Sequence, residues 1–128
     1  MLFRSAVDTT ASIGAGATVA ADDVTVEAKT PDAETSEFIV WGLAGAEGEQ
    51  TGLAGSVAIN LVTVSTTADI GAGADVTSTG DLEVTARSDL GIQNIAGGAA
   101  FGEDTGIGAA VSVNVLNNTT AADRKSTR

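Results

Sequence analysis

The chain of 128 residues contains no cysteine and no histidine. Without cysteine there are no disulfides and no thiolate metal ligands, although many exported bacterial proteins also lack it. Without histidine the chain lacks the usual general base at neutral pH and the commonest transition-metal ligand. Aromatic residues make up 3% of the chain, so few large side chains are available to fill a wide core. These absences favour a narrow core of small aliphatic residues.

Positive charge is also scarce. The net charge is −11, and sixteen of the seventeen acidic residues lie between Ser5 and Ala122, where the cations are Lys29 and Arg87. Such a surface repels phosphate backbones and anionic lipid, so we expect no nucleic-acid partner. The longest apolar run, Leu53–Val64, is interrupted by polar residues and is too short to span a bilayer, which predicts no membrane insertion.

What the chain does have is a long internal repeat. TTASIGAGATV (Thr9–Val19) returns as TTADIGAGADV (Thr66–Val76), and TGLAGSVAINLV (Thr51–Val62) returns as TGIGAAVSVNVL (Thr105–Leu116). We divide the chain into repeat 1 (5–64), repeat 2 (65–118) and the start of a third copy (119–128). Repeats of this length are typical of stacked architectures.

The conserved blocks predict β-strands. In repeat 1, Val24, Val26 and Ala28 alternate with polar residues, and repeat 2 has Leu82, Val84 and Ala86 at the same places. This period-2 pattern places the apolar set on the buried side. By the same rule we expect Val57, Ile59 and Leu61, which alternate with Ser56, Ala58 and Asn60, to face inward. No segment has a helical period, so the chain is predicted to be all-β.

Two further features refine this prediction. The repeats differ in length where polar Lys29–Glu37 is replaced by Arg87–Gly91, which predicts a surface loop. In the block FIVWGLAGA, the large residues Phe38 and Trp41 fall on opposite parity. That mismatch leaves a bulge or a strand buried on both sides as alternatives.

The pattern A-x-I-G-A-G-A-x-V, then D-V/L-x-V-x-A, then T-G-L/I-x-x-x-V-x-[IV]-N, resembles repeats of filamentous-haemagglutinin-like bacterial surface proteins, including leukotoxin-type filamentous adhesins. The resemblance covers nearly the whole chain. It implies a right-handed parallel β-solenoid (β-helix), an extracellular or cell-surface location, and a role as a stalk or adhesive fibre. It carries over no catalytic residue.

Strand and turn lengths predict about two solenoid coils in each repeat. Equivalent residues of successive coils would form ladders. Exposed end coils would be adhesive edges, so we expect neighbouring repeats as partners and a tendency to end-to-end self-association.

Glycine motifs are the first candidate sites. Gly14-Ala15-Gly16, Gly71-Ala72-Gly73 and Gly106-Ile107-Gly108 each lack the third glycine of a dinucleotide-binding loop. We therefore interpret them as tight turns between strands.

Acidic residues form the second group of candidate sites. The pairs Asp22-Asp23, Glu47/Glu49 and Glu103-Asp104 suggest a carboxylate pair or a calcium site. Their spacing matches no calcium loop, so we expect solvated loops, with weak calcium binding left open. The series Asp69, Asp75 and Asp81 is interpreted as a solvated face.

Asparagine, threonine and tryptophan residues form the third group of candidate sites. Asn60 and Asn114 occupy the same place in the two copies, which predicts an internal amide ladder or a strand end more readily than a glycan contact. Thr25 and Thr85 do not recur at equivalent sites, which argues against an ice-binding array. Trp41, whose counterpart is Ile95, is expected in the core or a seam rather than on a sugar.

The sequence therefore predicts no catalytic, cofactor-binding or metal-ligating residue, and no enzyme activity. The first hypothesis is a non-catalytic structural segment of an exported adhesin. The second is a module that binds a host glycan or protein. The third is a polysaccharide-degrading β-helix enzyme, which would need a cluster of acids and cations that the repeats do not supply.

Overall fold

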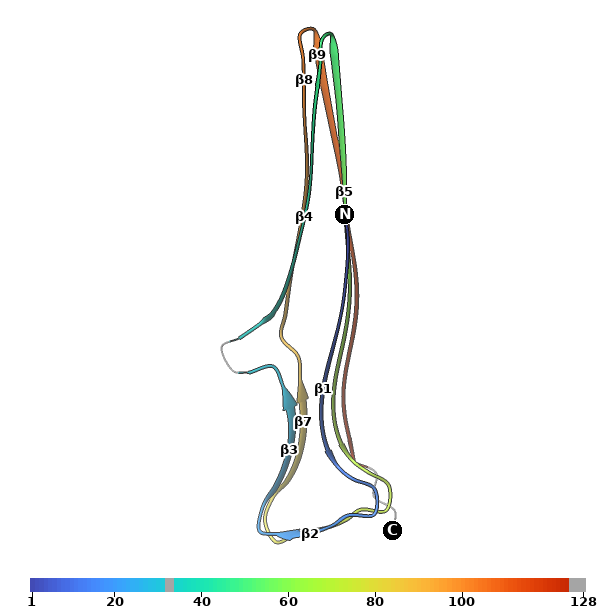
Figure 1. Ribbon diagram of the computed structural model, residues 1–128. Coiled ribbons are helices and arrows are strands. Elements are labelled where there is room, and N and C mark those ends of the chain that lie inside the picture. Colours follow the sequence, from blue (N-terminus) through green and yellow to red (C-terminus); the bar gives the residue numbers. More distant parts are fainter. Residues whose placement is uncertain (32–33, 125–128) are drawn as a thin grey trace. The chain divides into compact units, whose positions relative to one another are not determined.

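The computed structural model describes residues 1–31 and 34–124 and contains strands and turns (Figure 1). The described residues include no helix long and apolar enough to cross a membrane. The strands are β1 (Leu2–Ile13), β2 (Thr18–Ala21), β3 (Val24–Lys29), β4 (Ser36–Gly48), β5 (Thr51–Ile70), β6 (Asp75–Ser78), β7 (Leu82–Arg87), β8 (Leu90–Gly102) and β9 (Thr105–Arg124). The prediction of an all-β chain is confirmed.

Two compact units share these strands, and each draws on both repeats. The first, the arm unit, comprises Met1–Ala6, Glu37–Thr63 and Gly91–Asn117. The second, the coil unit, has its described residues in Val7–Ser36, Val64–Leu90 and the segment 118–124, apart from positions 32 and 33. The repeats are therefore units of sequence, and the compact units cut across them. Positions 125–128 of the expected third copy lie outside the described residues.

Equivalent strands of the two repeats pair in parallel in the coil unit. In the β2–β6 sheet Thr18 faces Asp75, and in the β3–β7 sheet Val24 faces Leu82. Figure 1 shows β3 lying along β7. Each strand thus pairs with its counterpart one whole repeat further on. The estimate of about two coils in each repeat is wrong, because paired strands would then be half a repeat apart.

The core of the coil unit is a small aliphatic cluster. Val26, Ala28, Ala68 and Ile70 are buried, and partly buried residues pack against them: Ala11, Ile13, Ala74, Val76, Leu82, Val84 and Ala86. Full burial of a valine or isoleucine side chain such as Val26 or Ile70 stabilises the fold by about 1.5–3 kcal/mol, and that of an alanine methyl by less. The predicted inward set of β3 and β7 is therefore confirmed. The predicted loop falls between β3 and β4, and its positions 32 and 33 lie outside the described residues.

The arm unit has two layers of strands. The β4–β8 pair forms one layer, and segments of β1, β5 and β9 in that order form the other (Figure 1). Glycine and alanine line the space between the layers. A Cβ added at Gly42 of β4 would lie 3.0 Å from the Cβ of Ala58 on β5, and one added at Gly52 would lie 2.7 Å from the carbonyl carbon of Phe101 on β8. At these positions the layers are too close for large side chains to fit between them, whereas Phe38 and Val40 are buried at the other end of β4.

The inward face of β5 is the reverse of the one predicted. Ser56, Ala58 and Asn60 are buried, whereas Val57 is 46% exposed. The cause is that β5 runs unbroken from Thr51 to Ile70, so one parity holds throughout. The even-numbered positions are the buried ones along the whole strand, so Ser56, Ala58 and Asn60 rather than Val57 face inward in the arm unit.

Strand β4 also has a simple alternation. Phe38 and Val40 are 8% and 1% exposed, while Trp41 is 58% exposed. Alternation continues along the strand, so neither a bulge nor burial on both sides is needed. The prediction that Trp41 lies in the core is wrong.

Candidate functional site

Two glycine motifs form turns that lie one on the other. Within Gly14–Ala17 and within Gly71–Ala74, the last amide donates to the first carbonyl at 3.2 Å. Gly16 and Gly73 have φ of 70° and 73°, which is the third position of a type II turn and favours glycine. The amide of Gly16 also donates to the carbonyl of Ala72 at 3.2 Å. The prediction of tight turns is confirmed for these two motifs.

The third glycine motif lies inside a strand. Gly106 and Gly108 belong to β9, where an added Cβ would collide with the backbone of Ala100 or Gly98 on β8. The prediction of a turn at this motif is wrong. Here glycine is required by the close approach of the two layers rather than by a positive φ.

The acidic pair Asp22-Asp23 holds the neighbouring turn of repeat 2. A carboxylate oxygen of Asp22 accepts a hydrogen bond from the Thr79 hydroxyl at 2.9 Å, and one of Asp23 accepts the Asp81 amide at 2.8 Å. A Cβ at Gly80 would collide with the Asp23 carboxylate. Each of these carboxylates therefore has a structural partner in the next repeat.

Acidic residues also gather at the turn between β4 and β5. Glu47, Gly48, Glu49 and Glu103 line an open hollow of about 410 Å³. In the described part of the chain, no group of three or more acidic side chains is placed to hold a metal ion. Calcium binding at these acids stays a prediction without a ligand set. Asp69, Asp75 and Asp81, interpreted above as a solvated face, lie on or beside three different strands; Asp75 and Asp81 are exposed and Asp69 is partly exposed.

The repeated asparagines do not form a ladder with each other. Asn60 is 1% exposed, and neither of its amide atoms has a hydrogen-bond partner. The Asn114 side-chain oxygen instead accepts from Asn94 at 3.0 Å, and the same Asn94 nitrogen lies 3.1 Å from the Ala58 carbonyl and 2.9 Å from that of Val113. Asn94 thus ties β8 to β5 and β9. Alignment of the repeats offered no signal for it, because its counterpart Val40 is apolar.

Threonines form no flat array on the outer face of the β3–β7 sheet. Thr25 lies beside Glu83 in the register, and the Thr85 hydroxyl donates to the Glu83 carboxylate at 2.9 Å. Charged and hydroxyl groups are therefore mixed on this face, as is usual for a surface exposed to solvent.

The two cations of the repeats lie next to each other. Lys29 and Arg87 are partners in the β3–β7 register. Lys29 forms an ion pair with Glu27 at 3.1 Å, and Arg87 forms one with Asp89 at 3.1 Å. Both are partly exposed surface pairs, which contribute about 0–1 kcal/mol each to stability. Their like charges are neutralised locally.

Exposed apolar side chains on the outer side of β4 and β8 are the feature that sequence reasoning missed. On the outer side of β4 and β8, five large side chains are 42–71% exposed. We call this the apolar outer face; it consists of Ile39, Trp41, Leu43, Ile95 and Phe101. The signal was the block FIVWGLAGA itself, in which both parities carry large apolar residues. Such a surface marks an interaction site more often than isolated exposed apolar residues do.

Comparison with protein-family models, curated proteins and solved structures gave no match to this chain.

Proposed function

We propose that this chain is a structural segment, part of a stalk or fibre, of a secreted or surface-anchored bacterial adhesin, and that it has no catalytic role. Its two repeats would be successive coils of a right-handed parallel β-solenoid, with one coil in each repeat. The observation that carries the proposal is the register: β2 pairs with β6 and β3 with β7 in parallel, each one repeat apart. The resemblance of the repeats to filamentous surface adhesins supports it.

Stacking explains how such a segment would extend. The turns interlock between repeats, since the Asp75 amide donates to the Ala17 carbonyl at 2.7 Å and the Gly71 amide to that of Ile13 at 2.8 Å. A further repeat meeting the outer edges of β6 and β7 would repeat these contacts. Stability then grows with each added neighbour. The same edges would let separate copies associate end to end.

The charge distribution supports export and solubility of a long array. A net charge of −11 keeps neighbouring fibres apart in solution and disfavours nucleic acid as a partner.

Labelling of intact cells tests the location. An antibody raised against this chain is expected to stain the source bacterium without permeabilisation, and protease added outside the cells is expected to remove the signal. A cytoplasmic protein assayed in parallel controls for lysis. Staining that needs permeabilised cells would contradict the proposal.

The second candidate is a module that binds a host glycan or protein. The exposed Trp41 favours it, because an exposed indole can stack on a sugar ring. A glycan array probed with the native chain and with Trp41→Ala separates the two functions: binding lost in the variant favours the module. The third candidate is a polysaccharide-degrading enzyme. In the part of the chain that the structure describes, no cluster of side chains favours it.

A further inference from the structure

One side chain inside the arm unit is buried without a polar partner. Asn60 lies on the inward face of β5 and is 1% exposed, and neither its side-chain nitrogen nor its side-chain oxygen has a hydrogen-bond partner among the described residues. Buried polar groups in folded proteins are nearly always bonded, either to the protein or to ordered water. The amide of Asn60 therefore points to a ligand within the arm unit.

A second unpaired amide atom comes from the facing layer. The side-chain nitrogen of Asn94 on β8 lies 2.9 Å from the Val113 carbonyl oxygen and 3.0 Å from the Asn114 side-chain oxygen. The same nitrogen lies 3.1 Å from the Ala58 carbonyl oxygen. Turning this amide over would bring its oxygen against three acceptors, so its orientation is fixed. The Asn94 side-chain oxygen is thereby directed away from them, and it is buried without a partner.

Both amides lie at the same level of the arm unit. Asn94 bonds to the carbonyl of Ala58, and Asn60 follows Ala58 by two positions on the same face of β5. Two residues span about 7 Å along a strand. One water joins polar atoms up to about 6 Å apart, because each of its hydrogen bonds is about 2.8 Å long. Water that bridges the two amides therefore fits this spacing.

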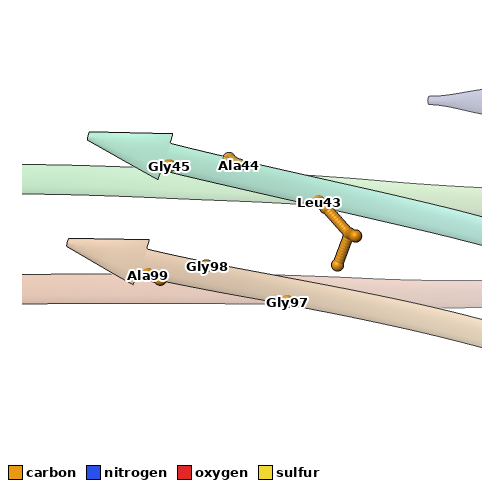
Figure 2. Close-up of a pocket in the computed structure, with 6 residues that line it drawn as sticks. All are labelled: Leu43, Ala44, Gly45, Gly97, Gly98 and Ala99. Carbon is orange, nitrogen blue, oxygen red and sulfur yellow. The ribbon is translucent and has the colours of Figure 1, made fainter.

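The small residues of the arm unit cannot supply the missing partners. Glycine and alanine have no polar side-chain atoms, and Figure 2 shows a stretch of β4 and β8 where they and Leu43 line an open hollow of about 470 Å³: Ala44, Gly45, Gly97, Gly98 and Ala99. Water stays inside a protein where polar groups hold it, not where the lining is apolar. Asn60 and Asn94 are polar groups of this kind.

We propose that the arm unit binds internal water between its two layers, held by the unpaired amide atoms of Asn60 and Asn94. These atoms are one nitrogen, which donates, and two oxygens, which accept. Water does both, so it matches the set. An anion needs donors and a cation needs acceptors, and either would be buried without a counter-charge. Such water joins β5 to β8 by hydrogen bonds nearly as favourable as direct ones.

This inference concerns the interior of the arm unit and does not rest on the adhesin role proposed above. Cross-relaxation between water and the protein, measured by NMR on the isotope-labelled full chain, is the test. The methyl group of Ala58 is the probe, because Ala58 is 0% exposed and water next to it is internal. The native chain is expected to show a water cross-peak at this methyl, with opposite signs in the laboratory and rotating frames. That sign change distinguishes held water from the fast-exchanging water of a surface.

Two variants remove the amides one at a time. Asn60→Leu keeps the side-chain shape without the polar atoms and is expected to lose the cross-peak. Asn94→Val, which copies the residue of repeat 1 at Val40, removes the acceptor of the other layer and is expected to lose it too. The matched control is Asn117→Leu on β9, because Asn117 is exposed in the same unit, and it is expected to keep the cross-peak.

Three outcomes would overturn the proposal. The first is a native chain without the cross-peak, which would mean that the two amides turn to bond with each other or with the backbone. The second is a cross-peak that persists in folded Asn60→Leu or folded Asn94→Val, as it would if a nearby serine hydroxyl relayed the signal. The third is equal loss in the Asn117→Leu control. Because the first outcome needs no variant, the test holds even where a substitution prevents folding.

Discussion

Replacing Ala58 by glutamate is expected to unfold the chain, whereas the same replacement at the neighbouring Val57 is expected to leave it folded. Ala58 is 0% exposed and faces the thin interior between the layers of the arm unit, while Val57 is 46% exposed. A buried carboxylate without a partner costs more than about 4 kcal/mol, a large part of the stability of an ordinary domain. An exposed substitution usually changes stability by about 0.5 kcal/mol or less.

Urea unfolding followed by far-UV circular dichroism measures both variants. The pair is informative because the alternation of large and small residues alone would place Val57 inside and Ala58 outside. Equal stability of the two variants, or a more damaging Val57→Glu, would show that the inward face of β5 has been assigned the wrong way round.

Gly52→Ala is expected to destabilise the chain by about 2–3 kcal/mol, because overpacking of this kind typically costs about 1–3 kcal/mol. The added Cβ would lie 3.0 Å from the amide nitrogen of Phe101 and closer still to the carbonyl carbon and oxygen of the same residue. A peptide backbone cannot move aside as the end of a flexible side chain can, so the two layers would have to separate.

Gly55→Ala on the same strand is the matched control. Its Cβ would have its nearest neighbour, the Ala109 carbonyl oxygen, at 4.0 Å, which is ordinary contact. Removing a glycine from a strand without a clash should leave stability unchanged or raise it by about 0.5–1 kcal/mol. In thermal unfolding, Gly52→Ala is expected to have a clearly lower melting temperature than Gly55→Ala. Equal melting temperatures would mean that the layers are not in close contact at Gly52.

The sequence predicted correctly wherever a local rule decides the structure. Val24, Val26 and Ala28 alternate with polar residues and are buried. Gly16 and Gly73 are in turns that need a positive φ, which glycine adopts without strain. In both cases the residue's own side chain or backbone determines whether it is buried or forms a turn. The sequence of one repeat is therefore enough to predict the local structure.

Long-range effects account for the errors. The inward face of β5 is the one whose small residues meet the facing layer, where a Cβ at Gly42 would lie 3.0 Å from that of Ala58, and the size of the residues near Val57 does not reveal this contact. Trp41 is exposed because it falls on the outward parity of β4, whose inward positions are taken by Phe38 and Val40. Asn94 bonds to β5 and β9 through a contact that appears once the strands are assembled.

The candidate surface was hidden for a related reason. Ile39, Trp41 and Leu43 read as core residues when an apolar side chain is assumed to be buried. Knowing that Phe38 and Val40 already occupy the inward positions makes the other set external. The absence of charge from 38–46 was visible in the sequence, but its meaning depends on which face looks outward.

The central claim is that equivalent strands of the two repeats pair in parallel, one whole repeat apart, and a disulfide tests it most directly. The chain has no native cysteine, and Ala20 is the register partner of Thr77 with both side chains exposed. Neighbouring strands lie about 4.8 Å apart, within the usual Cα separation of a disulfide. Under mild oxidation, Ala20→Cys with Thr77→Cys is expected to form an intrachain disulfide, identified by peptide mass mapping of the monomer. Ala20→Cys with Ser78→Cys, whose side chains point to opposite faces, should form little. No 20–77 disulfide in a folded monomer, or equal yields in the two pairs, would contradict the register.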